Sequence, residues 1–246
     1  MSVDRHFTLD GQQVPFEEGQ SIMVAARAAG VYIPHLCFNP DFAAHGSCRV
    51  CLTKVNGRPQ AACTTPAAAG QVVESETEEL REIRRGILQM LFVEGNHICP
   101  ACEKSGACQL QAVAYYVGML DPHYPHFYPR RAVDASHPEV LIDFNRCILC
   151  ELCVRASRDV DGKNVFAVQG RGIHAHLVVN TPSGRLGATA FKATDKAAQV
   201  CPTGAILIKH RGYESPIGQR LYDRRAVDVV GDVAQVPESE GGRRHG

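Results

Sequence analysis

One short segment of the sequence, from Gly95 to Cys108, is rich in side chains that bind metals. His97, Cys99, Cys102 and Cys108 follow the pattern His-x-Cys-x2-Cys-x5-Cys. A segment this short can bring all four donors to one point. Thiolates together with one imidazole suit either zinc or an iron–sulfur cluster. The segment alone does not choose between them, so the remaining cysteines must decide.

The chain has 11 cysteines, an odd number. With His97 they give twelve candidate ligands, which divide by spacing into three sets of four with no cysteine left over. The first set is Cys37, Cys48, Cys51 and Cys63; the second is His97, Cys99, Cys102 and Cys108; the third is Cys147, Cys150, Cys153 and Cys201. This partition predicts three metal centres rather than disulfides, which are rare in a reducing compartment.

Composition limits the kinds of protein that the chain can be. Its 246 residues are enough for two or three small domains. Lysine plus arginine equals aspartate plus glutamate, 26 each, which gives no sign of binding to nucleic acid or to an acidic membrane. No apolar run reaches the roughly 20 residues that span a bilayer, and the N-terminus does not have the pattern of a signal peptide. We therefore expect a cytoplasmic protein.

The first segment, residues 1–79, has the pattern of an α+β domain of the β-grasp type. Asp10-Gly11 and Asn56-Gly57 each lie between short apolar runs and predict two hairpins. Residues 21–30 have helical spacing, with Ser21 as the N-cap and Gly30 at the end. Small residues before Cys48, namely Gly46 and Ser47, would let backbone N–H groups approach the sulfur atoms.

The spacing of the first cysteine set helps to choose its metal. Plant-type ferredoxins use C-x4-C-x2-C with a distant fourth cysteine, whereas the first gap here is ten residues. This spacing resembles the [2Fe-2S] domain at the start of the large iron–sulfur subunit of respiratory complex I and of iron-only hydrogenases. The alternative is a zinc site, but zinc ribbons favour two C-x2-C pairs and only one pair here has that spacing.

The second segment, residues 80–135, is predicted to be helical on either side of its ligands. Leu80, Ile83, Ile87, Leu88 and Leu91 predict an amphipathic helix over residues 78–92, which Gly95 ends, and a second helix follows over 109–117. Residues 121–138 are predicted to be an ordered linker. Its histidines, His123, His126 and His137, are expected to pack or form hydrogen bonds. If His97 is instead a surface residue, an external group would complete the second set.

The third segment, residues 136–212, contains CxxCxxC from Cys147 to Cys153 and then Cys201-Pro202. This pattern resembles a bacterial ferredoxin that has kept one of its two [4Fe-4S] sites. Strands are predicted over residues 140–143 and 206–209, and an inserted hairpin is predicted from residues 165–169 and 173–179. The Gly170-x-Gly172 pair lacks a third glycine and is not interpreted as a nucleotide loop.

The C-terminal extension, residues 213–246, contains Val227, Val229, Val230 and Val233. This apolar stretch could dock on a partner subunit or form a loosely packed tail, and the sequence leaves both open. From Glu238 onward, glycine and charged residues dominate, so the end is predicted to be mobile.

Taken together, GNHICPACEKSGACQLQ behind a β-grasp segment resembles the histidine–cysteine [4Fe-4S] domain shared by several oxidoreductases. They are complex I, iron-only hydrogenases, some formate dehydrogenases and the NAD-reducing [NiFe] hydrogenases. The chain is most similar to the last group, namely to the small (gamma) subunit of the diaphorase half, over residues 1–225 or so.

The resemblance implies an electron-relay function with no catalytic residue in this chain. It implies one [2Fe-2S] cluster on the first set and a [4Fe-4S] cluster on each of the other two. The implied partners are an FMN- and NAD(H)-binding diaphorase large subunit and the small and large [NiFe] hydrogenase subunits. FMN and the [NiFe] centre would belong to those partners. No membrane partner is implied. The overall reaction would be H2 + NAD+ = NADH + H+.

Three other functions stay open from the sequence. The chain could be an electron-transfer subunit of a complex I-like NADH dehydrogenase or of an NAD-dependent formate dehydrogenase. It could also be a free-standing electron carrier. A structural zinc protein with no redox role is the third, and analysis of iron and acid-labile sulfide would separate it from the others.

Overall fold

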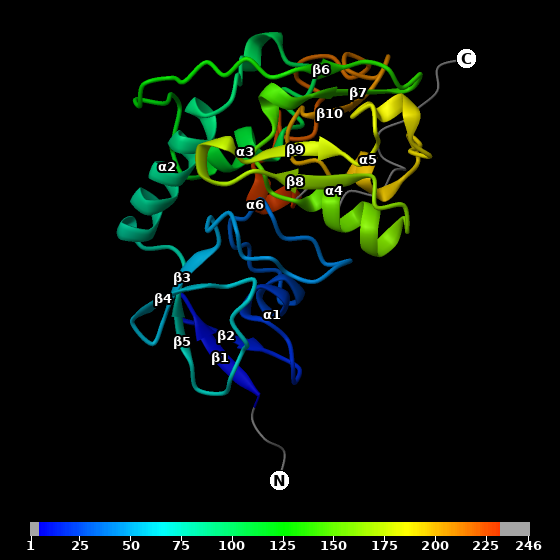
Figure 1. Ribbon diagram of the computed structural model, residues 1–246. Helices are drawn as coiled ribbons and strands as arrows, with labels where there is room; N and C mark the ends of the chain where they lie inside the picture. Colours follow the sequence, from blue (N-terminus) through cyan, green and yellow to red (C-terminus); the bar gives the residue numbers. More distant parts are fainter. Residues whose placement is uncertain (1–4, 232–246) are drawn as a thin grey trace, which may run out of the picture.

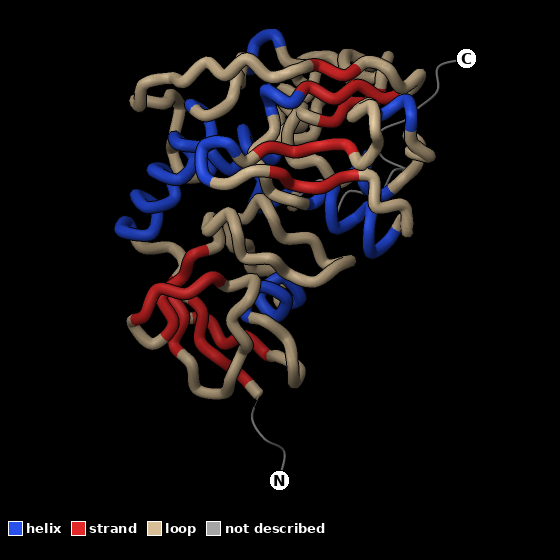
Figure 2. The backbone as a smooth tube through the Cα atoms, viewed as in Figure 1, coloured by secondary structure: helices blue, strands red, loops and turns tan. Residues whose placement is uncertain are grey.

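A computed structural model of the protein describes residues 5–231. Figure 1 shows two lobes, with the N-terminal sheet and helix α1 in one and all later elements in the other. Figure 2 shows that long loops fill much of the space between the short helices and strands. No helix within residues 5–231 is both long enough and apolar enough to cross a membrane.

The N-terminal lobe is a five-stranded mixed sheet in the order β2-β1-β5-β3-β4. The strands are β1 His6–Leu9, β2 Gln12–Pro15, β3 Leu52–Val55, β4 Arg58–Ala61 and β5 Val72–Glu74. Both predicted hairpins are confirmed, since β1 pairs with β2 and β3 pairs with β4, each antiparallel. Asp10 and Asn56 adopt left-handed φ angles of 47° and 49°, which these turns require. Strand β5 joins the hairpins by running parallel to β1 and antiparallel to β3.

Helix α1, Ile22–Ala28, packs on this sheet as the spacing predicts. The Ser21 hydroxyl accepts a hydrogen bond from the N–H of Val24 and so caps the first turn. Ile22, Met23, Ala25 and Ala26 are buried in the same apolar core as Phe7, Leu9 and Val14 from the sheet.

Helix α2, Glu78–Val93, is confirmed, but its buried face differs from the prediction. Leu80 and Leu88 are buried, whereas Ile83 is exposed and Arg84 is fully buried. The Arg84 guanidinium donates to the carbonyl oxygens of Val50 (3.1 Å), Leu52 (2.9 Å) and Ser75 (2.8 Å). These buried carbonyl groups of the N-terminal lobe need a donor, so an arginine takes a position on α2 that spacing assigns to an apolar residue.

Helix α3, Gln109–Tyr116, follows the second ligand set and packs against α2. The linker that comes next contains strand β6, Val133–Asp134. Among its histidines, His137 is buried and hydrogen-bonds to the carbonyl oxygen of Phe191 (3.0 Å) and to the N–H groups of Glu139 and Val140. His123 and His126 are exposed, and the ring of His126 stacks on Tyr128.

The third segment is built on a three-stranded antiparallel sheet in the order β10-β7-β6. Its further elements are β7 Val140–Asp143, α4 Leu152–Arg155, β8 Phe166–Gln169, β9 His176–Val179, α5 Lys196–Gln199 and β10 Ile206–Ile208. The inserted hairpin is confirmed as β8 paired with β9, but its second strand starts three residues later than predicted. Ile173 lies in a short 3-10 turn, Gly172–His174, and is 86 % exposed, because the chain must first reverse direction.

The C-terminal extension packs on this same chain through helix α6, Val227–Val230. Val227 is buried in one core with Leu110 and Val113 of α3, whereas Val229 is 65 % exposed. The described part of the extension is therefore docked on the lobe that holds α2 and α3. Val233 and the segment from Glu238 lie outside the described residues.

Candidate iron–sulfur sites

The first predicted set comes from two loops and the end of the second hairpin. Cys37 lies in the long loop after α1, Cys48 and Cys51 lie at the end of that loop, and Cys63 follows β4. Hydrogen bonds connect the side chain of Cys37 with those of Cys48 and Cys63, and the side chain of Cys51 with that of Cys63. Apart from the half-buried Cys48, the set is at most 2 % exposed. All four predicted ligands are therefore together.

Mutual contact changes the acidity of these thiols. Hydrogen bonds from Cys48 and Cys63 lower the pKa of Cys37, and the Ser47 side chain adds to this effect. The same hydrogen bonds raise the pKa of Cys48 and Cys63, because these two retain the protons. Binding of a metal would displace the remaining protons, since a metal binds thiolates.

The second set surrounds one cavity between the end of α2 and the start of α3. His97, Cys99, Cys102 and Cys108 all line this cavity, together with Phe92 and Leu110. A short 3-10 turn, Cys99–Ala101, leads from Cys99 to Cys102, and Cys108 is the N-cap residue of α3. The two helices therefore hold the ends of the ligand segment on either side of a common centre.

His97 has an environment that suits a metal ligand. Its Nε2 atom is buried, and within the described chain it has no hydrogen-bond partner. Burial, and then the nearby charge of Arg146, lower the pKa of His97 to about 4, so the imidazole is neutral and has a free lone pair. A buried polar atom without a partner is costly, and a bound iron would remove that cost.

Gly95 has a role that helical spacing alone does not reveal. Helix α2 already ends at Val93, with Glu94 as its C-cap. A Cβ atom at position 95 would lie 2.6 Å from His97 Nε2. Glycine at this position therefore leaves room for the imidazole.

The third set also lines a single cavity. Cys147, Cys150, Cys153 and Cys201 face it, with Ile148 and Leu177 among its other walls. Burial raises the pKa of Cys147 to about 11, and burial likewise raises the pKa of Cys150 and Cys153. Backbone hydrogen bonds from Leu149, Leu152 and Val154 favour the thiolates. N–H groups aimed at sulfur are the kind of interaction that tunes iron–sulfur centres.

Backbone strain gathers in two of these ligand loops. Arg49 lies between Cys48 and Cys51 and has φ 58°, while Leu149 and Glu151 flank Cys150 with φ 53° and 57°. A non-glycine residue in the left-handed region costs on the order of 1 kcal/mol. The loops keep this strain because it turns consecutive cysteines toward one centre.

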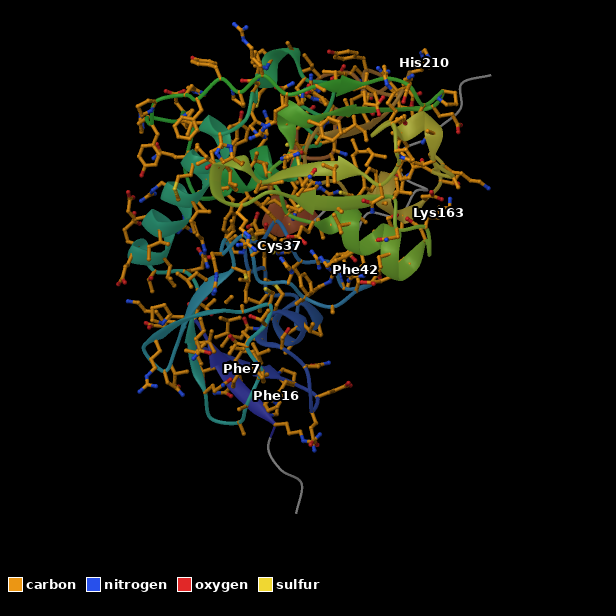
Figure 3. All side chains as sticks on the ribbon, in the orientation of Figure 1. Phe7, Phe16, Cys37, Phe42, Lys163 and His210 are labelled. Carbon is orange, nitrogen blue, oxygen red and sulfur yellow. The ribbon has the colours of Figure 1, made fainter. Side chains whose placement is uncertain are left out.

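Contacts of single residues link the third set to each of the other two. The guanidinium of the buried Arg155 donates to the carbonyl oxygens of Cys37, Ala43 and Cys150. It also lies 4.9 Å from the ring centre of Phe42, and Figure 3 shows Cys37 and Phe42 where the two lobes meet. Arg155 therefore connects the first and third sets.

The second and third sets meet at Pro202. Its carbonyl oxygen accepts a hydrogen bond from the N–H of Gln109 (2.9 Å) and lies 3.6 Å from Cys108 Sγ. Arg155, Gln109 and the contact at Pro202 were not predicted from the sequence. The sequence around Arg155 and around Cys201-Pro202 gives no information on which distant group each will contact.

Within residues 5–231, no group of three or more His, Cys, Asp or Glu side chains is placed to hold a single metal ion.

Three protein-family models match the chain, each over one ligand set. The 2Fe-2S iron-sulfur cluster binding domain matches residues 5–78. The NADH-ubiquinone oxidoreductase-G iron-sulfur binding region matches residues 84–123, and the 4Fe-4S single cluster domain matches residues 140–208. The chain thus carries a 2Fe-2S domain and 4Fe-4S domains, and the described folds combine helices and strands.

Similar proteins include both hydrogenase and complex I subunits. The NAD-reducing hydrogenase HoxS subunit gamma of Cupriavidus necator is 40% identical over 221 residues, covering 89% of this chain and 94% of that protein. The 78 kDa subunit of mitochondrial NADH-ubiquinone oxidoreductase from Candida albicans is 35% identical, but this chain covers only 28% of it.

A solved structure agrees with the hydrogenase comparison. A chain of the NAD+-reducing [NiFe]-hydrogenase in the H2-reduced state superposes with a TM-score of 0.89 and is 52% identical. The match covers 92% of this chain and 96% of that one. The protein described here therefore belongs to the family of gamma subunits of NAD-reducing hydrogenases.

Proposed function

We propose that the chain is the iron–sulfur electron-relay subunit of an NAD-reducing hydrogenase that catalyses H2 + NAD+ = NADH + H+. The observation that carries this proposal is that three four-donor sets lie close together, the first and third linked through Arg155 and the second and third through Pro202. When bound, iron–sulfur clusters accept and release single electrons. Adjacent sets within one small protein suit transport between partners better than chemistry on a substrate.

The proposed ligands follow the three sets. A [2Fe-2S] cluster would be held by Cys37, Cys48, Cys51 and Cys63 in a β-grasp domain of residues 1–79. A [4Fe-4S] cluster would be held by His97, Cys99, Cys102 and Cys108 in the helical domain of residues 80–135. Another would be held by Cys147, Cys150, Cys153 and Cys201 in the ferredoxin-like domain of residues 136–212, with residues 213–246 as an extension.

The proposed partners and location come from the same family. An FMN- and NAD(H)-binding diaphorase subunit would lie on one side, and the small and large [NiFe] hydrogenase subunits on the other. FMN and the [NiFe] centre would belong to those partners, and the assembly would be cytoplasmic.

The second candidate is an electron-transfer subunit of a complex I-like NADH dehydrogenase. It is favoured by the 35% identity to the 78 kDa subunit over 82% of this chain. Affinity purification of the tagged chain from its own cells distinguishes the two. Copurification of FMN-containing and nickel-containing subunits is expected, whereas subunits of a quinone-reducing enzyme would support the second candidate.

Iron content and His97 test the proposed ligands directly. Anaerobically purified protein should contain about ten irons per chain. His97→Cys should keep this iron, with a more negative potential of the middle cluster because a thiolate adds negative charge. His97→Ala should make that cluster labile, while His123→Ala, at an exposed histidine, should change neither property. Full iron and an unchanged redox spectrum in His97→Ala would show that another group completes the site.

A further inference from the structure

Arg146 stands directly between the second and third ligand sets. It immediately precedes Cys147 of the third set in the sequence, yet its side chain lines the cavity of the second set beside Cys102. Its backbone carbonyl oxygen accepts a hydrogen bond from the Thr203 hydroxyl (2.9 Å), two residues after Cys201. Arg146 therefore contacts the surroundings of both sets at once.

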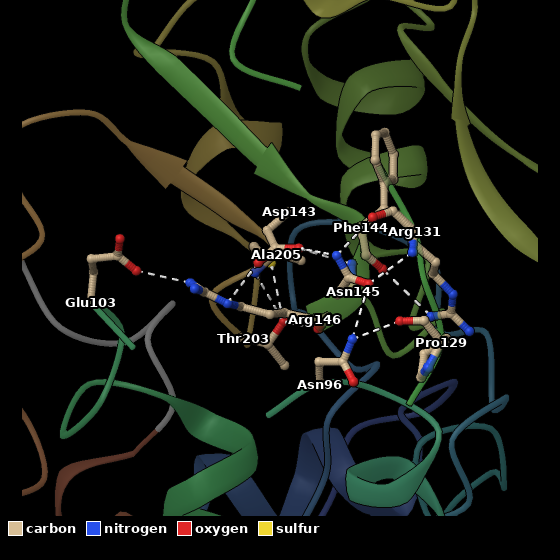
Figure 4. Close-up of polar contacts among 11 residues, drawn as sticks. Asn96, Glu103, Pro129, Arg131, Asp143, Phe144, Asn145, Arg146, Thr203 and Ala205 are labelled. Atoms are coloured by element: carbon tan, nitrogen blue, oxygen red, sulfur yellow. Dashed lines mark hydrogen bonds and ion pairs between the residues drawn. The ribbon is translucent and has the colours of Figure 1, made fainter. Parts of the chain in front are cut away.

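Two carboxylates hold the guanidinium in this place. Nη1 lies 2.8 Å from Glu103 Oε2, and Nε lies 2.9 Å from Asp143 Oδ2. Figure 4 shows the side chain of Arg146 extended toward Glu103, with Asp143 and Thr203 beside it. Glu103 follows Cys102, so this ion pair joins the residue after one ligand to the residue before a ligand of the other set.

Close packing around Gly204 fixes the approach. A Cβ atom at position 204 would lie 2.9 Å from Cys102 Sγ and 3.3 Å from Arg146 Nη1. The segment after Cys201 therefore passes between the two sets only because position 204 has no side chain. The sulfur atom and the guanidinium both lie next to the position that a side chain of residue 204 would occupy.

Arg146 places a positive charge beside the second ligand set. The Arg146 side chain is only 19% exposed, so water screens its charge less than at the surface. A guanidinium stays protonated in proteins, so Arg146 keeps its positive charge whatever the oxidation state of its neighbours.

We propose that Arg146 is a positioning residue that raises the reduction potential of the middle cluster and fixes its ligand loop against that of the third. The proposal rests on the proposed function, since it assigns a role toward clusters of that relay. Reduction adds one electron, supplied by a partner subunit, and no bond or proton of Arg146 changes. A fixed positive charge favours the state with the extra electron, so it raises the potential.

The proposal is tested by redox titration of the whole purified complex, followed by electron paramagnetic resonance. The middle-cluster signal is identified as the one whose potential changes in His97→Cys. Arg146→Gln is expected to lower the potential of that signal more than the potential of the third cluster. Arg146→Lys should restore most of the loss, and Glu103→Gln should raise the potential because a negative charge is removed.

A matched control is Arg5→Gln, because Arg5 also forms an ion pair, with Glu18 at 3.0 Å, but lies in the opposite lobe. It should leave all three potentials unchanged. If Arg146→Gln keeps its iron and the middle-cluster potential does not change, the proposal is overturned. If Arg146→Gln does not assemble, Glu103→Gln decides, and an unchanged potential there overturns the proposal. An unmodified protein without iron would instead overturn the proposed function itself.

Discussion

The N-terminal lobe and the region of α2 and α3 differ in where their apolar cores come from. The core of the N-terminal lobe lies entirely within residues 7–73, from its own sheet and helix. The core around α2 and α3 takes Leu36 and Val50 from the N-terminal lobe and Val227 from the C-terminal extension. The first region has the contacts to be stable by itself, whereas the second depends on distant segments and on its ligand set.

This difference indicates how a cofactor can take the place of a core. Helices α2 and α3 flank the second set, and the chain between them, residues 94–108, carries all four of its donors. Small domains of this kind often fold only with their metal, because metal binding supplies the free energy of folding. The N-terminal sheet should need its cluster much less.

Removal of iron should give the largest difference in amide protection between the two regions. After anaerobic chelation, amide hydrogens of α3 should lose their protection completely, because the ligand segment no longer holds the helix. Amides of β1, β3 and β5 should remain protected, since their core is made mostly of apolar side chains of the same lobe and includes only Cys51 and Cys63 of the ligands. Hydrogen exchange read by mass spectrometry measures both in one sample. Reconstitution with iron and sulfide is the control, and unchanged protection of α3 would contradict the comparison.

The features predicted from the sequence are those set by local chemistry. Asp10-Gly11 and Asn56-Gly57 specify turns over two residues, and the four strands of the two hairpins that they predict are present. Cysteine spacing grouped most of the candidate ligands, because cysteines two or three residues apart must also lie close together in space. The structure brings each group around one point, and ligation itself stays a proposal.

The features that were not predicted all depend on partners far away in the sequence. Helical spacing assigned Ile83 to the buried face, but Arg84 is buried because the carbonyl groups of Val50 and Leu52 lie there. Arg146 and Arg155 likewise find carbonyls or carboxylates on other loops. Charge and spacing in a single segment carry no information about such partners, so only the three-dimensional arrangement reveals them.

Substitution of Arg84 should have the next largest effect, because this residue connects the two regions. Arg84→Met leaves three backbone carbonyl groups without their donor, which should cost about 3–5 kcal/mol. For a chain of this size the apparent Tm should fall by about 10 °C.

The control is one turn away on the same helix. Arg81 forms an exposed ion pair with Glu76 at 2.8 Å, so Arg81→Met should cost no more than about 1 kcal/mol. Thermal melts of the iron-loaded proteins, followed by circular dichroism, compare the two. Equal losses in both variants would mean that Arg84 acts only as a surface charge and does not join the lobes.

The smallest expected effect lies where the C-terminal extension covers the region of α2 and α3. Val227 is 1 % exposed and shares a core with Leu110 and Val113. Val227→Ala removes two buried methyl groups and should cost about 1–1.5 kcal/mol. Because α6 has only four residues, the loss should be local and should not unfold the lobe.

Hydrogen exchange again gives the measurement, now on the iron-loaded protein. Amides of α6 and of the facing turn of α3 should exchange about tenfold faster in Val227→Ala, which corresponds to about 1.4 kcal/mol of local stability. Val229→Ala, at a side chain that is 65 % exposed, should leave them unchanged. The N-terminal sheet should be unaffected in both variants, since its core contains no residue of the extension. Faster exchange of the sheet in Val227→Ala would show that the extension stabilises both lobes, and the contrast between their cores would then not describe their stability.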